Sequence, residues 1–346
     1  MNNVFFVILA GGQGQRLWPL SRQNTPKPLI PFLGEKSLLE QTIERIQDLT
    51  ESKQNIVIVT ASDQFASVNN LVNDKVDQII SEPEGKNTAP AILLSCLKIK
   101  EQNENAVIVV LSADHFIPEK GKFQEYLRNV IQFASKNDEL AIFGLKPRYA
   151  ATGYGYIQAD TFSEMKKENF ESYKVLKFHE KPNQDVADLY VECSYMFWNV
   201  GIFVSNLKTF LNEFEKHQPK LVEQMQNYLK TGNGYEDLQS ISVDYAVLEK
   251  SENVTVFPAD FEWYDVGNLD VFLTLQEKHY QKQKNIIDID SQNNLVNTKK
   301  LAVLIDVEDL CVVETNDVIL ISKRDKVEKV KNVVGFLSEQ KLKELL

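Results

Sequence analysis

The first apolar run and the loop after it constrain this chain most strongly. Val4–Leu9 has the length of a buried strand and leads through Ala10 into three glycines, Gly11, Gly12 and Gly14. Glycines at such a point let backbone N–H groups approach an anion closely, because they lack a side chain and accept unusual backbone angles. Taken alone, these glycines fit a simple turn that leaves an edge strand equally well.

The charge pattern separates the two interpretations. The chain carries a net charge of -11, yet no Asp or Glu precedes Glu35, while Arg16, Arg22 and Lys27 all lie in that acid-free segment. A cationic loop on an acidic protein indicates an anionic small molecule as ligand. The same acidic balance argues against binding nucleic acid or an anionic membrane, because both need a broad basic surface.

Two better-known glycine motifs do not fit. The dinucleotide fingerprint requires a glycine three residues after Gly14, where this chain has Leu17. The P-loop pattern requires Gly-Lys-Ser/Thr, whereas the pair Gly85-Lys86 is followed by Asn87. We therefore expect neither a Rossmann dinucleotide site nor a Walker A site.

The cysteines and the N-terminal residues indicate the cellular compartment in which the protein works. Cys96, Cys193 and Cys311 are far apart and odd in number, which fits neither a disulfide framework nor a zinc site. No Lys or Arg precedes Val4, and the apolar run there is shorter than a secretion signal needs. No later run approaches the ~20 apolar residues of a membrane span. We expect a cytoplasmic protein with no membrane contact.

Strand-like and helix-like patterns alternate through most of the chain. A capping box at Ser37–Glu40 opens the first expected helix. This alternation predicts an α/β fold with a doubly wound, mostly parallel, Rossmann-like sheet and helices on both faces. We expect strands at 4–9, 56–60, 76–80, 106–111, 140–145, 156–159, 173–178 and 196–204, and helices at 38–49, 65–71, 88–100, 123–134, 207–216, 221–229 and 269–284.

The pattern changes after residue 284. Short strands are expected at 301–305, 310–313 and 318–321, separated by acidic and Asn-bearing turns. We predict a main domain of residues 1–284 and a small β-rich C-terminal domain of residues 285–346, with a β-helix as one form that it could take. So small a module is rarely stable alone, so its apolar runs should be buried on the main domain, in a homodimer, or in both. We expect it to serve assembly rather than chemistry.

In open α/β sheets, ligands bind beyond the carboxyl ends of the strands. Asp114 and Asp265 both follow apolar segments, and together they offer two hard oxygen ligands of the kind that Mg²⁺ uses, although each alone would suit a turn. We expect His115 to be structural, because the other histidines form no cluster with it. Thr88 is expected to cap a helix that faces the same crevice.

The motifs together resemble the sugar-nucleotidyltransferase superfamily, and within it the mannose-1-phosphate guanylyltransferase family. Residues 11–22 and the following Pro26–Pro28 match the signature loop of that family. Residues 178–182 match its sugar-phosphate motif, with His179 where Val is more common. The likeness spans about residues 4–280, since the stretches 86–91, 114–115, 199–203, 244–246 and 263–267 also match in order.

The resemblance implies that an oxygen of mannose 1-phosphate attacks the α-phosphorus of GTP and expels pyrophosphate, with Mg²⁺ as cofactor. Catalysis would then rest on positioning and charge neutralisation. The expected catalytic residues are Arg16 and Lys27, and the expected metal ligands are Asp114 and Asp265. The expected nucleotide contacts are Leu9, Ala10, Gly11, Gly12, Gly14, Glu82, Lys86, Asn87, Thr88 and Ser112, and the expected sugar-phosphate contacts are Gly153, Tyr154, Glu180, Lys181 and Asn199.

Two alternatives stay open. The same scaffold could activate another sugar 1-phosphate or use another base, although residues 86–91 favour GTP by resemblance, with Glu82 as an acceptor for the guanine donors. A non-catalytic regulator that binds a nucleotide sugar is disfavoured, because the expected catalytic cations and metal carboxylates are all present. No His follows His279, so we do not expect the isomerase activity that longer family members carry.

Overall fold

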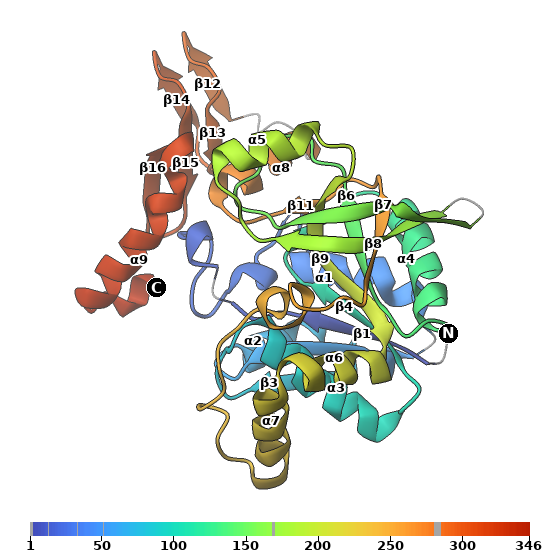
Figure 1. Cartoon of the computed structure of the whole chain (residues 1–346). Helices are drawn as coiled ribbons and strands as arrows, with labels where there is room; N and C mark the ends of the chain where they lie inside the picture. Colours follow the sequence, from blue (N-terminus) through green and yellow to red (C-terminus); the bar gives the residue numbers. More distant parts are fainter. Residues whose placement is uncertain (1–2, 13, 33, 51, 168–169, 280–284) are drawn as a thin grey trace.

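The structure is a computed structural model that describes residues 3–12, 14–32, 34–50, 52–167, 170–279 and 285–346. A nine-stranded sheet forms the centre of its main body, and the C-terminal module projects to one side of that body (Figure 1). The strands of this sheet are β1 (Val4–Leu9), β2 (Ile56–Ala61), β3 (Gln78–Glu82), β4 (Val107–Ser112), β6 (Leu140–Leu145), β7 (Tyr156–Lys167), β8 (Phe170–His179), β9 (Met196–Asn206) and β10 (Val254–Ala259).

The sheet has the order β3-β2-β1-β4-β9-β6-β10-β8-β7. β1 pairs in parallel with β2 and β4, and β10 pairs in parallel with β6. β8 and β9 run antiparallel to the strands beside them. The α/β sheet expected from the sequence is therefore confirmed, and the carboxyl ends of β1 and β4 lie side by side at one edge.

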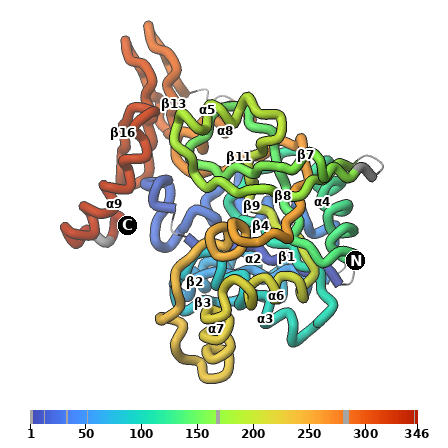
Figure 2. The backbone as a smooth tube through the Cα atoms, in the orientation of Figure 1, coloured from blue at the N-terminus to red at the C-terminus, as the bar shows by residue number. Residues whose placement is uncertain are grey.

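Helices cover both faces of the sheet (Figures 1 and 2). Alternate residues of β1 point to opposite faces, so Phe5 and Val7 belong to one buried cluster and Phe6 and Ile8 to another. The first cluster includes residues of α3 (Thr88–Gln102), α6 (Leu207–His217) and α7 (Pro219–Thr231). The second includes residues of α1 (Leu38–Ile46), α2 (Phe65–Val72) and α4 (Lys120–Ala134).

Several boundaries differ from the sequence-based expectation. β3 begins at Gln78 rather than Val76, because pairing with β2 starts there. β10 was not expected, since Pro258 cannot donate a hydrogen bond. The proline is tolerated in this strand because β8 pairs with β10 only at Thr255 and Val256, so no hydrogen bond to β8 is needed at Pro258. The helix α5 (Gln184–Glu192) was also missed, because Ala187 alone is buried among its residues, all of which the structure describes.

Two helix ends test the capping predictions. Ser37 and Glu40 form the expected capping box at α1. At α3 the expectation was wrong: the cap is Asn87, whose side chain accepts a hydrogen bond from the Thr88 N–H at 2.8 Å. Thr88 is instead the first helical residue, and its hydroxyl accepts from the N–H of Val243 at 2.8 Å. The helix expected at 269–284 is α8 (Leu269–His279), and residues 280–284 lie outside the described residues.

The C-terminal module is rich in β-strands, as expected. Its parallel pairs are both offset by 16 residues, Ile286 with Ala302 and Leu295 with Cys311. Positive backbone φ angles recur with the same spacing at the corners, at 51° for Asp290 and 52° for Asp306, so acidic residues in left-handed conformation turn the chain once per coil. The module contains β12 (Ile286–Ile289), β13 (Leu295–Asn297), β14 (Ala302–Ile305), β15 (Leu310–Glu314), β16 (Ile319–Lys323) and the unexpected helix α9 (Val330–Glu339).

The module docks on the main domain through its last helix. Trp18 is buried against Val330 and Leu337 of α9, and its indole N–H donates to the carbonyl of Leu345 at 2.7 Å. Arg324 adds an ion pair with Asp270 of α8 at 2.6 Å. Docking on the main domain is therefore observed, and Trp18 serves as a packing residue in it.

The module's outer strands keep apolar side chains exposed in one copy of the chain, so their expected burial against a second copy stays a prediction. Leu301, directly before β14, is 62% exposed, and Ile305 at the end of β14 is 61% exposed. Ile319 and Ile321 on β16 are both 66% exposed. Within one copy of the chain these apolar runs are not buried. In the described part of the chain, no helix has both the length and the apolar character that crossing a bilayer requires.

Candidate active site

Gly14 fixes the geometry of the loop after β1. Its φ is +65°, and a Cβ atom there would lie 2.3 Å from the Cβ of Lys27. Both facts require glycine, because a larger residue would be strained and would displace Lys27. The Ser21 hydroxyl donates to the Gly14 carbonyl at 2.8 Å and closes the loop on itself. The glycine loop thereby holds Lys27 beside the end of β1.

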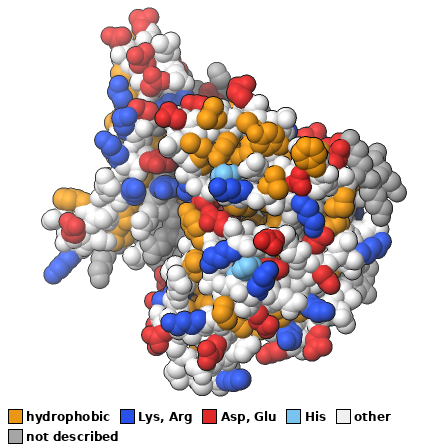
Figure 3. Space-filling view, viewed as in Figure 1, with side chains coloured by type: hydrophobic (Ala, Val, Ile, Leu, Met, Phe, Trp, Pro, Cys, Tyr) orange, Lys and Arg blue, Asp and Glu red, His pale blue; other side chains and the backbone are white. Residues whose placement is uncertain are grey.

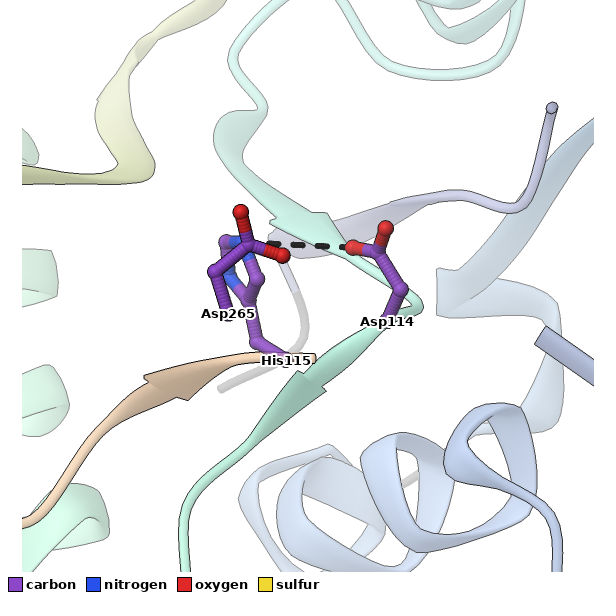
Figure 4. A group of neighbouring side chains, drawn as sticks. All are labelled: Asp114, His115 and Asp265. Atoms are coloured by element: carbon purple, nitrogen blue, oxygen red, sulfur yellow. Dashed lines mark ion pairs between the residues drawn. The ribbon is translucent and has the colours of Figure 1, made fainter. Parts of the chain in front are cut away.

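Two short strands bring the expected metal carboxylates together. Asp114 directly precedes β5 (His115–Phe116), and Asp265 ends β11 (Tyr264–Asp265). These strands pair antiparallel, with Asp265 opposite His115. Figure 4 shows the three side chains converging on the same space, with an ion pair between His115 and Asp114 at 3.9 Å. The sequence-based pairing of the two aspartates is thus realised in space.

Lys27 lies between the two carboxylates. Its Nζ atom is 2.6 Å from Oδ2 of Asp114 and 3.4 Å from Oδ1 of Asp265. Burial alone would lower the pKa of Lys27, but the charges of the two aspartates outweigh burial and raise the pKa. Lys27 is therefore a cation at neutral pH.

Asp114 is held in its charged form. Burial would raise the pKa of Asp114, but the positive charges of Lys27 and His115, together with hydrogen bonds from Lys27 and Ser112, bring the pKa far below its ordinary value. The Ser112 hydroxyl at the end of β4 donates directly to Asp114. Ser112 therefore acts on the site through this carboxylate.

These groups could hold a cation. Ligand atoms of Asp114, His115 and Asp265 all lie within 4.8 Å of one another. The two carboxylates supply the hard oxygen atoms that divalent cations such as Mg²⁺ prefer. His115 was expected to be structural, and its ring does pack edge-on against Trp263 at 5.2 Å. Its Nδ1 atom is buried without a hydrogen-bond partner among the described residues. The ring can therefore pack against Trp263 and still offer a nitrogen atom to a metal ion.

A cavity of about 580 Å³ opens between these elements. Its wall combines glycine backbone with cationic side chains and carboxylates. This is the composition that a complex of phosphate and metal requires. The lining residues are Gly11, Gly12, Gly14, Gln15, Arg16, Lys27, Pro28, Asp114, Asp265, Gly267 and Lys331.

Lys331 was not expected in this lining. It belongs to α9 of the C-terminal module, for which the sequence predicts assembly rather than chemistry, and that prediction stays untested. No sequence signal pointed to Lys331, because neither α9 nor its packing on Trp18 was foreseen. Lys331 and Arg16 make no ion pair or side-chain hydrogen bond with another described residue.

A second group of polar residues gathers around β9. The Asn199 side chain donates to Asp244 at 3.0 Å and accepts from the N–H of Gly201 at 3.0 Å. Burial, reinforced by the charge of Glu180, raises the pKa of Asp244 to about 6. The role of Asp244 was missed, although its motif was matched.

Lys181 and Glu180 belong to the same group. Their side chains form an ion pair, and Lys181 is largely exposed with a left-handed φ of 46°. A Cβ atom on Gly155 would lie 2.6 Å from Glu180 Oε2, so glycine there makes room for this carboxylate. Glu180, Lys181 and Asn199 are thus brought together as the sequence predicted.

Tyr154 connects the two groups. Its ring contacts Trp263 at 5.2 Å, and Trp263 in turn contacts His115. Trp263 itself is buried. Gly153 lies next to Tyr154 with open space around it. Of the expected sugar-phosphate residues, Tyr154 therefore reaches the carboxylate pair through Trp263, and all five lie outside the described lining of the cavity.

The expected base-binding residues lie apart from the cavity lining. Glu82 is buried and accepts a hydrogen bond from Tyr235, a partner that the sequence did not indicate. Burial raises the pKa of Glu82 to about 7, against the opposing effect of that hydrogen bond. Lys86 donates to the Glu236 carbonyl at 2.6 Å. Asn87 and Thr88 are occupied at the start of α3 as described above.

Leu9 and Ala10 serve mainly the sheet. The Ala10 N–H donates to the Val59 carbonyl at 2.8 Å, and the Ala10 carbonyl accepts from the Thr60 hydroxyl at 3.2 Å. The Leu9 carbonyl accepts from the N–H of Ala113 at 3.0 Å. Gly11 and Gly12 are exposed and line the cavity, so the free backbone of the loop begins at Gly11.

Comparisons with known proteins agree with this geometry. Residues 6–282 match the family model described as nucleotidyl transferase, and residues 284–337 match the one described as MannoseP isomerase/GMP-like beta-helix domain. Mannose-1-phosphate guanylyltransferase 2 of Escherichia coli O157:H7 is 34% identical over 364 residues, covering 99% of this chain and 75% of that protein. The chain belongs to the nucleotidyl transferase family. Within this family it groups with the mannose-1-phosphate guanylyltransferases.

Other relatives support the same family. Mannose-1-phosphate guanylyltransferase of Klebsiella pneumoniae is 34% identical and covers 98% of this chain and 74% of that protein. A solved structure from Thermus thermophilus, described as a mannose-1-phosphate geranyltransferase, has a TM-score of 0.85 and 29% identity, covering 97% of this chain and 99% of that one. This nucleotidyltransferase is therefore an enzyme, and its family generally uses a divalent metal.

Proposed function

We propose that this chain transfers GMP from GTP to mannose 1-phosphate and releases pyrophosphate. A phosphate oxygen of mannose 1-phosphate forms a bond to the α-phosphorus of GTP, and the bond from that phosphorus to the β-phosphate oxygen breaks. The products are GDP-mannose and pyrophosphate. One observation carries the proposal: a single cavity combines the glycine loop, Arg16, Lys27 and the carboxylates of Asp114 and Asp265.

The triphosphate would lie along the glycine loop. The exposed backbone of Gly11 and Gly12 can donate to phosphate oxygens, and Gly14 permits Lys27 to stand beside them. The guanidinium of Arg16 has no ion pair or side-chain hydrogen bond among the described residues. It can therefore bind two phosphate oxygens at once. With its raised pKa, Lys27 can neutralise negative charge on the phosphates.

Asp114 and Asp265 would hold Mg²⁺. Their oxygen atoms come within ligating reach of one space, and both already stabilise a cation there, the ammonium of Lys27. Mg²⁺, when bound, supplies neutralisation of charge on the reacting phosphates. The Ser112 hydroxyl and the Arg45 guanidinium, which donates to the His115 carbonyl at 3.1 Å, hold these ligands in position.

The sugar phosphate would bind at the second group. Lys181 is the cation for the phosphate of mannose 1-phosphate, because its side chain is exposed. Partial burial lowers the pKa of Lys181, but the hydrogen bond and the charge of Glu180 outweigh burial and raise the pKa. Glu180, Asn199 and the Gly153-Tyr154 turn would meet the sugar hydroxyls. Asp244 would hold Asn199 in orientation through their hydrogen bond.

The guanine base would lie near the start of α3. Glu82, Lys86, Asn87 and Thr88 gather there, and Leu9 and Ala10 lie at the end of β1, which β2 separates from β3. A carboxylate has about four acceptor positions, so Glu82 can accept from guanine while it accepts from Tyr235. Adenine lacks the two adjacent donors and would leave an acceptor unpaired.

The chain would act as a homodimer through its module. Two alternate residues of β16, Ile319 and Ile321, are apolar and exposed. The same holds at β14 for Leu301, Val303 and Ile305. A row of exposed apolar residues on one face is typical of an interface, and a second copy offers the same row about a twofold axis. All three cysteines are free, which fits a reducing cytoplasm as the compartment.

The experiment that tests the reaction is ³¹P NMR of the full chain with GTP, mannose 1-phosphate and Mg²⁺. We expect resonances of GDP-mannose and pyrophosphate to grow together as those of GTP decline. Formation of GDP and inorganic phosphate without GDP-mannose would contradict the proposal, as would binding of GDP-mannose without turnover.

A further inference from the structure

We propose that Lys331 of the C-terminal module binds the β- and γ-phosphates of GTP, so that the module completes the triphosphate site. This inference rests on the proposed function, because it assigns one further residue to the same nucleotide. It also explains why a module of this size packs directly beside the glycine loop.

Lys331 is positioned to reach the triphosphate. It lines the same cavity of about 580 Å³ as Arg16, Lys27 and the two aspartates. Every other described residue of the lining belongs to the main domain, and Lys331 brings the module to this space. Figure 1 shows α9 beside the first loop of the chain, although the two are far apart in sequence.

The charges around the cavity leave two cations for the phosphates. Lys27 is already compensated by Asp114 and Asp265, so this trio carries a net negative charge before nucleotide binds. The uncompensated cations of the lining are Arg16 and Lys331, neither of which has a side-chain partner among the described residues. The attacked α-phosphate must lie near the carboxylate pair in the proposed reaction. Lys27 can serve that phosphate, as proposed above, and Arg16 and Lys331 are the further cations of the lining that are available to the other two.

Helix α9 is held firmly against the glycine loop. Val330, the neighbour of Lys331, is buried with Leu337 against Trp18 in the loop that carries Arg16. The Trp18 indole donates to the Leu345 carbonyl, and the N–H of Gln23 donates to the carbonyl of Leu346 at 3.2 Å. These contacts anchor both α9 and the segment that follows it. Lys331 is thus held on the far wall of the cavity by the same loop that forms the near wall.

The space-filling view is consistent with this arrangement. Acidic side chains gather at the far tip of the module, whereas basic side chains lie along its outer edge and nearer its junction with the main body (Figure 3). An anionic ligand is therefore disfavoured at that tip.

The test compares affinities of the full chain for GTP and GMP by titration calorimetry with Mg²⁺. We expect Lys331→Ala to weaken GTP binding about tenfold, which corresponds to ~1.4 kcal/mol, and to leave GMP binding within about twofold. Lys331→Arg should restore most of the GTP affinity. Lys329→Ala is the matched control, because Lys329 is an exposed lysine of the same segment that does not line the cavity.

Three results would overturn the inference. They are equal GTP affinity for Lys331→Ala and Lys329→Ala, an equal loss of GTP and GMP affinity in Lys331→Ala, and no rescue by Lys331→Arg. Thermal unfolding of the variants separates a binding loss from undocking of α9. Failure of the proposed reaction has a different signature: the wild-type chain would bind GTP more tightly than GMP, with the expected Lys331 effect, and would still form no GDP-mannose.

Discussion

The ammonium of Lys27 lies 2.6 Å from Oδ2 of Asp114, and this ion pair joins the glycine loop to the end of β4. Gly14 makes the approach possible, since a Cβ atom there would collide with Lys27. The raised pKa of Lys27 keeps it protonated, so it can exchange carboxylate for phosphate partners without a proton transfer. In the proposed function, this pair would hold a cation in the cavity before a triphosphate binds.

Asp114→Asn and Asp265→Asn should each reduce Mg²⁺-dependent turnover by at least about 100-fold with little loss of fold, because each removes a charged oxygen ligand. Pyrophosphate release measures the rate, and circular dichroism checks the fold. Asp260→Asn is the control, since that exposed carboxylate pairs with Lys122 away from the cavity. A near-normal rate in either site variant would show that the residue is a turn former rather than a metal ligand.

Lys181→Ala should mainly raise the KM for mannose 1-phosphate, by about tenfold, whereas Lys27→Ala should impair use of GTP. The reason is that the two lysines lie in different groups, one exposed beside Glu180 and one buried in the cavity. Steady-state kinetics with each substrate varied would separate the effects. Lys177→Ala, on the strand that leads to Lys181, serves as the control. Equal effects of Lys181→Ala on both KM values would contradict the division.

Glu82 should make stability depend on pH. Its pKa is raised to about 7 in the folded state from an ordinary 4.5, so the folded state holds the proton more tightly. The resulting stabilisation is fully present below pH ~4.5 and is lost as pH rises through ~7, with an upper bound of roughly 3 kcal/mol. Glu82→Gln should flatten this part of the profile in urea unfolding at several pH values. A wild-type profile that rises between pH ~5 and ~7 and is unchanged in the variant would contradict the assignment.

Ile319→Asp combined with Ile321→Asp should convert a dimer to a monomer, because charges would be buried at the proposed interface. Light scattering after gel filtration measures the mass. Leu189→Asp is the control, as Leu189 is an equally exposed apolar residue on α5 of the main domain. A monomeric wild-type chain, or a dimer that survives both changes, would exclude this interface.

The main sheet could be predicted well because its buried strands are continuous apolar runs. Val4–Leu9 and Leu140–Leu145 were predicted with their observed boundaries. The parallel pairing of β1 with β4 then places their carboxyl ends together, so the ends of strands were the right places to search for site residues. Asp114 and Asp265 were found in that way.

The failures have physical causes, some local and some tertiary. Pro258 concealed a strand whose neighbour covers only part of it, and Asn87 took the capping role expected of the adjacent Thr88. Lys331 could not be predicted, because its position depends on tertiary packing of Trp18 against α9. The bond between Tyr235 and Glu82 likewise joins residues far apart in sequence that no motif connects.

The proposed reaction is tested most directly by the rate of pyrophosphate release with GTP, ATP, CTP and UTP, each combined with mannose 1-phosphate and with other hexose 1-phosphates. We predict that GTP with mannose 1-phosphate gives the highest kcat/KM, at least about tenfold above ATP, because an unpaired acceptor at the base costs roughly 1–3 kcal/mol. Comparable rates with GTP and ATP, or a clear preference for another sugar 1-phosphate, would contradict it.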